Sequence, residues 1–419
     1  MPNFPVPQSA YLHIPFCRRR CYYCDFPIAV VGDRSLLAPG QPLQGNNSGT
    51  IAQYVEMLCR EIQLAPVSGQ PLETVFLGGG TPSLLSVSQL SHILDRLHER
   101  LGIAATAEIS MEMDPGTFDL AQLQGYRAAG VNRVSLGIQA FQPELLQVCG
   151  RSHTVEDIQI ALELIHQVEV PSFGLDLISG LPHQTLQQWQ DSLEQAIVLN
   201  PHHLSCYDLT IESMTPFGRQ YKPGQHPLPS DETAAQMYRL AQQSLTTAGY
   251  EHYEISNYAQ PGYQCRHNRV YWENRPFYGF GMGATSYLQE ERFARPRKTR
   301  EYYTWVEAIY RRESDAEGRE KGEAFSLDSD AATLHSASTS DALLDTLMLG
   351  LRLAEGLSRR DLAENFGTAI VEKICRCLAP YEPKGWLEIG SDRIRLIDPE
   401  GFLFSNVILI DLFEEFGEG

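Results

Sequence analysis

The sequence lacks the features that would place the protein across a membrane. No run approaches about 18 uninterrupted apolar residues, and the first residues, MPNFPVPQSAY, contain neither a basic start nor an apolar signal core. With 419 residues, 43% hydrophobic and 20% charged, the chain is long enough for a full core and more than one domain. We expect a cytoplasmic protein with no integral membrane segment, for which transient contact with a membrane protein stays open.

Positive charge is scarce. The chain contains 33 Lys and Arg against 52 Asp and Glu, a formal net charge of −19. A chain of this sign repels a phosphate backbone, so we expect no nucleic-acid partner.

Cysteine offers no disulfide framework, because the total is nine, an odd number, and six of these stand in otherwise ordinary segments. The other three, Cys17, Cys21 and Cys24, lie within eight residues of each other in HIPFCRRRCYYCDFPI. A closed metal site takes four ligands. These thiolates therefore either recruit a further ligand such as His13 and hold zinc, or hold three irons of a [4Fe–4S] cube whose fourth iron takes an external ligand.

Short β-rich runs alternate with segments of helical periodicity in the first 250 residues. Strands are expected in SAYLHIPF, ETVFLGGGTP, AEISMEMDPG, RVSLGIQAF, SFGLDLISGLP and HLSCYDLTIE. Helices are expected at residues 51–64, 88–101, 118–130, 154–168, 185–199 and 231–249. Six successive βα units predict an α/β fold with a parallel sheet, either curled into a partial barrel or doubly wound.

Polar and glycine-rich residues stand where the apolar runs end. In both forms of the sheet, ligands collect at the carboxyl ends of the strands, so these residues are expected to share one edge. They are the three cysteines, Gly78, Gly79, Gly80, Thr81, Glu112, Asp114, Gln139, Arg151, His153 and Asp176.

The cysteine spacing C-x3-C-x2-C, with YLHIPFC, GGGTP, EMDP, GIQ and DLISGLP, resembles the radical S-adenosylmethionine (SAM) proteins. The resemblance implies a partial (β/α)6 TIM-like barrel, with Cys17, Cys21 and Cys24 binding a [4Fe–4S] cluster and SAM chelating the open iron. Charge and hydrogen bonding match the ammonium group of SAM to Glu112, its carboxylate to Arg151, and its ribose diol to Gln139 with Asp176. The resemblance also implies SAM contacts from Tyr11, Tyr23, Gly79, Gly80 and Thr81, the glycines allowing close backbone approach.

Within that superfamily the chain resembles the branch of oxygen-independent coproporphyrinogen III dehydrogenases and HemW-type haem chaperones. The dehydrogenases carry an additional cysteine where this chain has Phe26, and a longer extension before the position of Tyr11. The resemblance therefore implies a chaperone that binds haem and delivers it to haem-accepting proteins. The alternative is radical-driven oxidative decarboxylation of coproporphyrinogen III in porphyrin biosynthesis, an enzyme activity that Phe26 and the short N-terminus disfavour.

The stretch YEISNYAQPGYQCRHNRVYW resembles the H-N-x-x-Y-W motif of the chaperones, matched by His267, Asn268, Tyr271 and Trp272. The imidazole of His267 is suited to an axial position on haem iron, and the two aromatic rings offer flat apolar surface to the macrocycle. Cys265 is a second candidate for the axial ligand. The alternative interpretation is a loop whose polar groups form hydrogen bonds and whose aromatic rings fill the core.

We expect a radical SAM core at 1–250, a barrel extension with the haem motif at 251–325, a linker at 326–340 and a C-terminal domain at 341–419. The C-terminal domain is predicted to contain helices and a hairpin through Ser391-Asp392, which is typical of a winged-helix-like module. Its 15 Asp/Glu against 8 Lys/Arg (net −7) argue against nucleic acid.

Residues 30–50 are expected to form a long loop, either a lid or a tolerated insertion. The glycine-rich run at 278–288 lacks the acidic residue of a dinucleotide site, and Thr285 and Asp208 are weaker candidates for SAM contacts.

Overall fold

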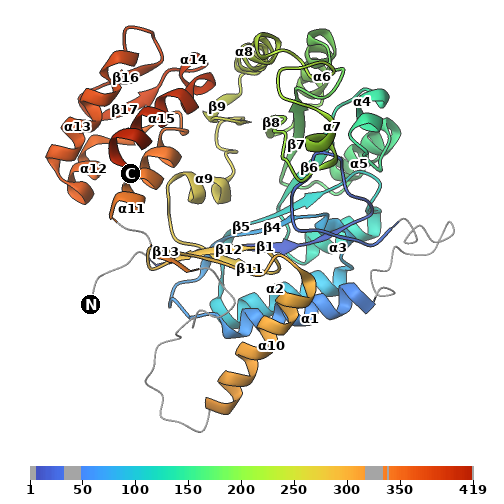
Figure 1. Cartoon of the computed structure of the whole chain (residues 1–419). Coiled ribbons are helices and arrows are strands. Elements are labelled where there is room, and N and C mark those ends of the chain that lie inside the picture. Colours follow the sequence, from blue (N-terminus) through green and yellow to red (C-terminus); the bar gives the residue numbers. More distant parts are fainter. Residues whose placement is uncertain (1–5, 33–48, 317–333, 337–338, 418–419) are drawn as a thin grey trace. The chain divides into compact units, whose positions relative to one another are not determined.

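The computed structural model describes residues 6–32, 49–316, 334–336 and 339–417 (Figure 1). Contacts divide the chain into two compact units that alternate along the sequence. The first comprises Met1–Gly174, Glu212–Gln220 and Pro276–Ser336, and the second comprises Leu175–Ile211, Tyr221–Arg275 and Ala337–Gly419. In the described parts of the chain, no helix combines the length and apolar character needed to cross a membrane.

The first unit is built on parallel strands in the order β11-β1-β4-β5-β6. Their side chains are buried along most of their length, as expected for a parallel sheet with both faces covered. The bounds are Ser9–Ile14 (β1), Leu72–Gly79 (β4), Ile103–Met113 (β5), Arg133–Gln139 (β6) and Tyr278–Phe280 (β11). Strands β2 (Phe16–Cys17) and β3 (Ala29–Val30) form a separate parallel pair beyond β1.

Helices connect these strands. Figure 1 shows α1 beside α2 and α10, and contacts join α1 to both. Capping boxes start α2 at Ser86 and α5 at Thr154, each satisfying backbone N–H groups of the first turn. The helices are α1 (Gly49–Leu64), α2 (Val87–Leu101), α3 (Leu120–Ala128), α4 (Pro143–Val148), α5 (Val155–Gln167), α7 (Pro216–Gln220) and α10 (Thr299–Ala316), with a 3-10 turn, η3 (Pro82–Leu84). A small antiparallel sheet consists of β12 (Thr285–Leu288), β13 (Glu291–Ala294) and β14 (Leu334–Ser336).

The second unit contains strands in the order β7-β8-β10-β9, of which β10 runs antiparallel to both its neighbours. Strand β7 begins at Ser172, so its first three residues belong to the first unit. The bounds are β7 (Ser172–Ser179), β8 (His203–Asp208), β9 (Glu251–Glu254), β10 (Asn257–Ala259), α6 (Leu186–Val198), α8 (Asp231–Thr247) and α9 (Arg266–Trp272).

The C-terminal part of the second unit packs helices around one apolar core that includes Leu347, Leu351, Ile374 and Ile408. Its helices are α11 (Thr339–Gly350), α12 (Arg359–Phe366), α13 (Thr368–Leu378), α14 (Glu400–Leu403) and α15 (Ser405–Phe416), with a 3-10 turn, η4 (Ala379–Tyr381). Its three-stranded sheet consists of β15 (Leu357–Ser358), β16 (Leu387–Ile389) and β17 (Arg393–Leu396) in the order β15-β17-β16. The hairpin expected through Ser391-Asp392 is the β16–β17 pair.

The α/β class and the C-terminal helical domain are confirmed, and each expected strand and helix of the first 250 residues has a counterpart. The sequence did not predict α4, or β11, which pairs with β1 from 268 residues further along the chain. Residues 33–48, 317–333 and 337–338 lie outside the described residues, so the loop at 30–50 and the linker at 326–340 are reached only at their ends. At those ends Leu334–Ser336 is β14, and α11 begins at Thr339. The boundaries at 250, 325 and 340 stay predictions.

Candidate functional site

The three clustered cysteines lie on the loop between β2 and β3. Cys17 ends β2, and the backbone N–H of Cys24 donates to the carbonyl of Cys21 at 3.2 Å. The guanidinium of Arg20 donates to the carbonyl oxygens of Cys24 and Phe26 at 3.1 Å each, which fixes the loop from one side. All three thiols are free and partly buried. The loop therefore presents three thiols from a braced backbone.

Burial makes two of these thiols, those of Cys17 and Cys24, reluctant to ionise. Burial, and then the charge of Asp114, raise the pKa of Cys17 to about 12, while a hydrogen bond from the Thr81 hydroxyl, 3.7 Å from the sulfur, opposes the shift. Burial also raises the pKa of Cys24. Thiolates become favourable here when a bound cation supplies compensating positive charge. Among the described residues, no three His, Cys, Asp or Glu side chains converge on a point that could hold one metal ion.

His13 is occupied by other partners. Its Nε2–H donates to the Pro27 carbonyl at 2.9 Å, and its Nδ1 accepts from the Tyr11 hydroxyl at 3.0 Å. Burial lowers the pKa of His13 to about 4, so the ring is neutral and these two bonds fix its tautomer. Neither ring nitrogen is available to complete a zinc site with the cysteines.

The Gly78-Gly79-Gly80 run at the end of β4 serves the packing of the chain itself. Gly79 has φ +107°, and a Cβ there would stand 2.4 Å from the ring of His13. A Cβ on Gly80 would stand 2.7 Å from the carbonyl oxygen of Phe16. The backbone N–H of Gly79 also donates to Glu112 Oε2 at 2.9 Å. From the sequence, we expected these glycines to allow close approach of a ligand. The contacts show that the absence of a Cβ at Gly79 and Gly80 also lets β1 and β2 pack closely against the end of β4.

Arg151 is the electrostatic centre of this edge of the sheet. Its Nη2 contacts Asp114 Oδ1 at 2.5 Å and donates to the Gly137 carbonyl at 2.8 Å. Its Nη1 lies 3.4 Å from the sulfur of Cys21 and 3.5 Å from the hydroxyl of Tyr23. The side chain is 7% exposed, and its Nε has no hydrogen-bond partner in the part of the chain that the structure describes. One guanidinium nitrogen thus stays available.

Asp114 and His153 hold this arginine in place. The Thr81 hydroxyl donates to Asp114 Oδ2 at 3.1 Å, so the carboxylate bridges β4 and Arg151. His153 donates from Nε2 to the Ile138 carbonyl at 3.3 Å and faces Arg151 with Nδ1 at 3.5 Å. Burial, and then the charge of Arg151, lower the pKa of His153 to about 4, so it stays neutral. The sequence placed both residues at strand ends without assigning either a function.

The structure brings together most of the predicted ligand residues. Gln139 ends β6 with φ +67°, and a Cβ on Gly137 would lie 3.1 Å from its amide nitrogen and 3.0 Å from Asp114 Oδ1. Tyr23 is partly buried, and burial raises its pKa well above the ordinary value. Tyr11 points at His13 and stacks on Phe76, with ring centroids 6.3 Å apart.

Asp176 belongs to the second unit. It lies in β7, where its charge raises the pKa of the buried Cys206 thiol, after burial itself and Asp208. Asp208 accepts a hydrogen bond from Ser179, and burial raises the pKa of its carboxyl group.

The H-N-x-x-Y-W motif forms α9, also in the second unit. His267 is 0% exposed, and its Nε2 lies 2.9 Å from the Tyr271 hydroxyl one turn later. Cys265, at the N-terminal end of the helix, is likewise 0% exposed, and its backbone N–H donates to the hydroxyl of Tyr253 at 3.4 Å. Asn268 is partly buried. Both candidate axial ligands are thus covered in this conformation.

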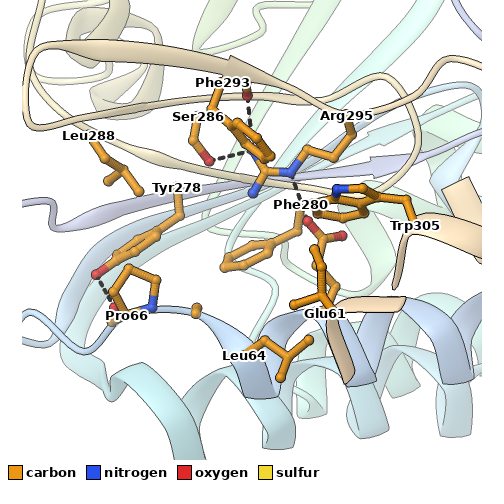
Figure 2. A pocket seen from close by; sticks show the side chains of 12 residues that line it. Glu61, Leu64, Pro66, Tyr278, Phe280, Ser286, Leu288, Phe293, Arg295 and Trp305 are labelled. Atoms are coloured by element: carbon orange, nitrogen blue, oxygen red, sulfur yellow. Dashed lines mark hydrogen bonds and ion pairs between the residues drawn. The ribbon is translucent and has the colours of Figure 1, made fainter. Parts of the chain in front are cut away.

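A small pocket lies between α1, α10 and strands β11 to β13. Figure 2 shows the guanidinium of Arg295 pointing at Glu61, with Ser286 and Phe293 on its other side. Arg295 Nε contacts Glu61 Oε1 at 2.7 Å, and Glu61 Oε2 accepts from Tyr302 at 2.7 Å. The ion pair is satisfied internally, so this pocket is an apolar space around a structural pair.

Comparison with known proteins finds two family models in the chain. Residues 11–196 match the radical SAM superfamily, and residues 337–404 match the HemN C-terminal domain. The curated relatives include the heme chaperone HemW of Synechocystis sp., 45% identical over 98% of this chain and 97% of the relative. HemW of Escherichia coli is 40% identical over 73% of this chain and 77% of its own. Among solved structures, coproporphyrinogen III oxidase (HemN) from E. coli, a radical SAM enzyme, aligns with a TM-score of 0.77, covering 97% of this chain and 90% of its own, at 23% identity.

Proposed function

Because the chain belongs to the HemW family of haem chaperones within the radical SAM superfamily, we propose that it binds haem and hands it to acceptor proteins in the cytoplasm. The observation that carries the proposal is the 45% identity to a heme chaperone over nearly the whole of both chains. The likeness to HemN, at 23% identity, concerns the fold alone. Phe26, 60% exposed, stands where the dehydrogenases carry a further cysteine.

Cys17, Cys21 and Cys24 would hold the [4Fe–4S] cluster that the superfamily implies. When bound, such a cluster supplies an iron with an open position for SAM and a source of single electrons. Two features of the loop fit that group. The thiols of Cys17 and Cys24 have raised pKa values that a bound cation would offset, and Arg20 braces the backbone by donating to the Cys24 carbonyl. The engaged ring of His13 argues against the zinc alternative.

For SAM, we propose that Arg151 binds the methionyl carboxylate and Glu112 the ammonium group. Arg151 is already oriented by Asp114, and its unpartnered buried Nε is the donor that such a carboxylate would satisfy. Glu112 receives one backbone N–H from Gly79, which orients the carboxylate for a second donor. The remaining SAM contacts that the resemblance implies in the first unit are those of Tyr11, Tyr23, Gly79, Gly80, Thr81 and Gln139, and the contact of Asp176, in the second unit, stays a prediction.

Haem is the cargo, and α9 is its proposed binding element. His267 is the proposed axial ligand, which requires that its Nε2 leave the Tyr271 hydroxyl. Asn268 and the rings of Tyr271 and Trp272 complete the motif. Cys265 is the alternative ligand, and its thiol is covered to the same extent.

The test is an anaerobic titration of cluster-reconstituted protein with haem, followed by visible absorption. Wild type should saturate near one equivalent, and His267→Ala should weaken binding or shift the spectrum. Tyr271→Phe removes the competing hydroxyl, so it should strengthen binding roughly threefold to tenfold, as expected from the net value of one hydrogen bond. If Cys265→Ala alone changes the spectrum, the ligand assignment moves to that cysteine.

Absence of saturable haem binding in wild type would refute the chaperone assignment. Anaerobic turnover of coproporphyrinogen III would then be the next assay. Robust formation of protoporphyrinogen would establish the dehydrogenase activity instead.

A further inference from the structure

Arg352 joins the C-terminal helices to the haem motif within the second unit. It lies in the turn after α11, where its carbonyl accepts from the backbone N–H of Ile255 at 3.0 Å. Its guanidinium carbon lies 6.0 Å from the centroid of the Trp272 ring, the last residue of α9. A backbone hydrogen bond therefore anchors the main chain of Arg352, and the ring of Trp272 lies beside its guanidinium group.

The charge of Arg352 is poorly compensated. Its Nη2 donates to the neutral amide oxygen of Asn406 at 3.2 Å, and its buried Nε has no partner among the described residues. Glu254 is the acidic group that acts on it, but no ion pair joins the two in the described structure, and burial raises the pKa of Glu254 to about 7. Burial lowers the pKa of Arg352 itself. An anion beside Arg352 would satisfy both the free N–H and the charge.

Arg269, on α9, is fully hydrogen-bonded, unlike Arg352. It donates to Glu355, to Glu273 at 2.8 Å and to Gln264 at 2.8 Å, so each of its guanidinium nitrogens has a partner. In a chain with a formal net charge of −19, a partly buried cation without a carboxylate partner stands out. Its contact with Trp272 places that cation next to the proposed haem-binding element.

We propose that Arg352 binds a propionate of the haem that α9 receives. This inference rests on the proposed function and deepens it. Haem carries two carboxylates at one edge of an otherwise apolar macrocycle, so a site that packs aromatic rings against the macrocycle needs a cation near that edge. The free Nε and the charge of Arg352 supply the donor and the cation. The C-terminal domain thereby contributes a residue to the cargo site.

The test compares haem with its dimethyl ester, in which both propionates are neutral, on full-length cluster-reconstituted protein. Arg352→Gln should weaken haem binding about tenfold and leave binding of the ester unchanged, as expected for the loss of one charge-assisted hydrogen bond. Arg352→Lys keeps the charge and should retain most of the affinity. Arg275→Gln is the matched control, because Arg275 lies three residues after the end of α9 but pairs with Glu273 at 2.8 Å, and it should change neither affinity.

The possible outcomes separate the two proposals. Equal losses for haem and ester in Arg352→Gln would overturn the propionate contact and leave only packing on Trp272. Unchanged haem affinity in that variant, with normal binding by wild type, would overturn the inference alone. Failure of wild type to bind haem would overturn the proposed function and the inference with it. Far-UV circular dichroism of each variant checks that its fold is intact.

Discussion

The contact between Asp114 and Arg151 makes a quantitative prediction about the apo protein. The two side chains are 22% and 7% exposed and meet at 2.5 Å. Removing one partner of a buried ion pair typically costs about 3 to 5 kcal/mol, because the remaining charge stays desolvated. Partial exposure of Asp114 reduces that cost, so we expect Asp114→Asn and Arg151→Met each to lower the free energy of unfolding by about 2 to 3 kcal/mol.

The double variant distinguishes an ion pair from two independent contacts. With both charges gone, no charge is stranded, so Asp114→Asn/Arg151→Met should cost no more than either single change. The coupling free energy should then be about 2 kcal/mol. Urea denaturation of cluster-free protein, followed by circular dichroism, measures all four free energies, and equal m-values would show that the same transition is compared. Additivity within about 0.5 kcal/mol would refute the pair as the organising contact of this edge.

A second readout tests whether Asp114 positions Arg151 for a ligand. In reconstituted protein, Asp114→Asn should weaken SAM binding about tenfold at an unchanged iron content, because it removes no thiolate but frees the guanidinium to rotate. Loss of iron with normal SAM affinity would contradict the assignment of Asp114 as the residue that positions Arg151 for SAM. Cys21→Ser is the complementary variant, because it removes a proposed cluster ligand and should lower the iron content.

Two further predictions concern stability. Burial raises the pKa of Glu254 to about 7 in the folded protein, so the unfolded chain ionises first as the pH rises from 4.5, and wild type should lose about 3 kcal/mol of stability by pH 7. Glu254→Gln should remove this part of the pH dependence in urea titrations between pH 5 and 8, and parallel curves for the two proteins would contradict the assignment. Gly79→Ala should lower the melting temperature more than Gly69→Ala, because both glycines have positive φ but only the first has a neighbour, His13, in the space of the new Cβ. Equal losses would show that backbone strain alone decides the cost.

The sequence could place Asp114 and Arg151 at one edge because of a topological constraint. In a parallel sheet all carboxyl ends meet at one edge, so Asp114, which follows β5, and Arg151, which comes after β6 and α4, were expected near each other, and their side chains meet at 2.5 Å. The same reasoning could not find β11. Its three residues lie in a glycine-rich run that indicates a turn, and their partners in β1 are 268 residues earlier, so no local pattern records the pairing.

The sequence could not show which side chains contact each other in the folded protein, and the H-N-x-x-Y-W motif is an example. The resemblance to the H-N-x-x-Y-W motif proposed His267 as a ligand and Tyr271 as an apolar surface, yet helical spacing of four residues also brings the imidazole and the hydroxyl into hydrogen-bonding range. On the proposed assignment, haem binding at His267 competes with an existing hydrogen bond, and affinity is set by the difference between two states of α9 rather than by the ligand alone. For a carrier that must release its cargo, such competition weakens binding without removing any contact to haem. Tyr271→Phe separates these effects, since it should bind haem more tightly and release it to an acceptor more slowly than wild type.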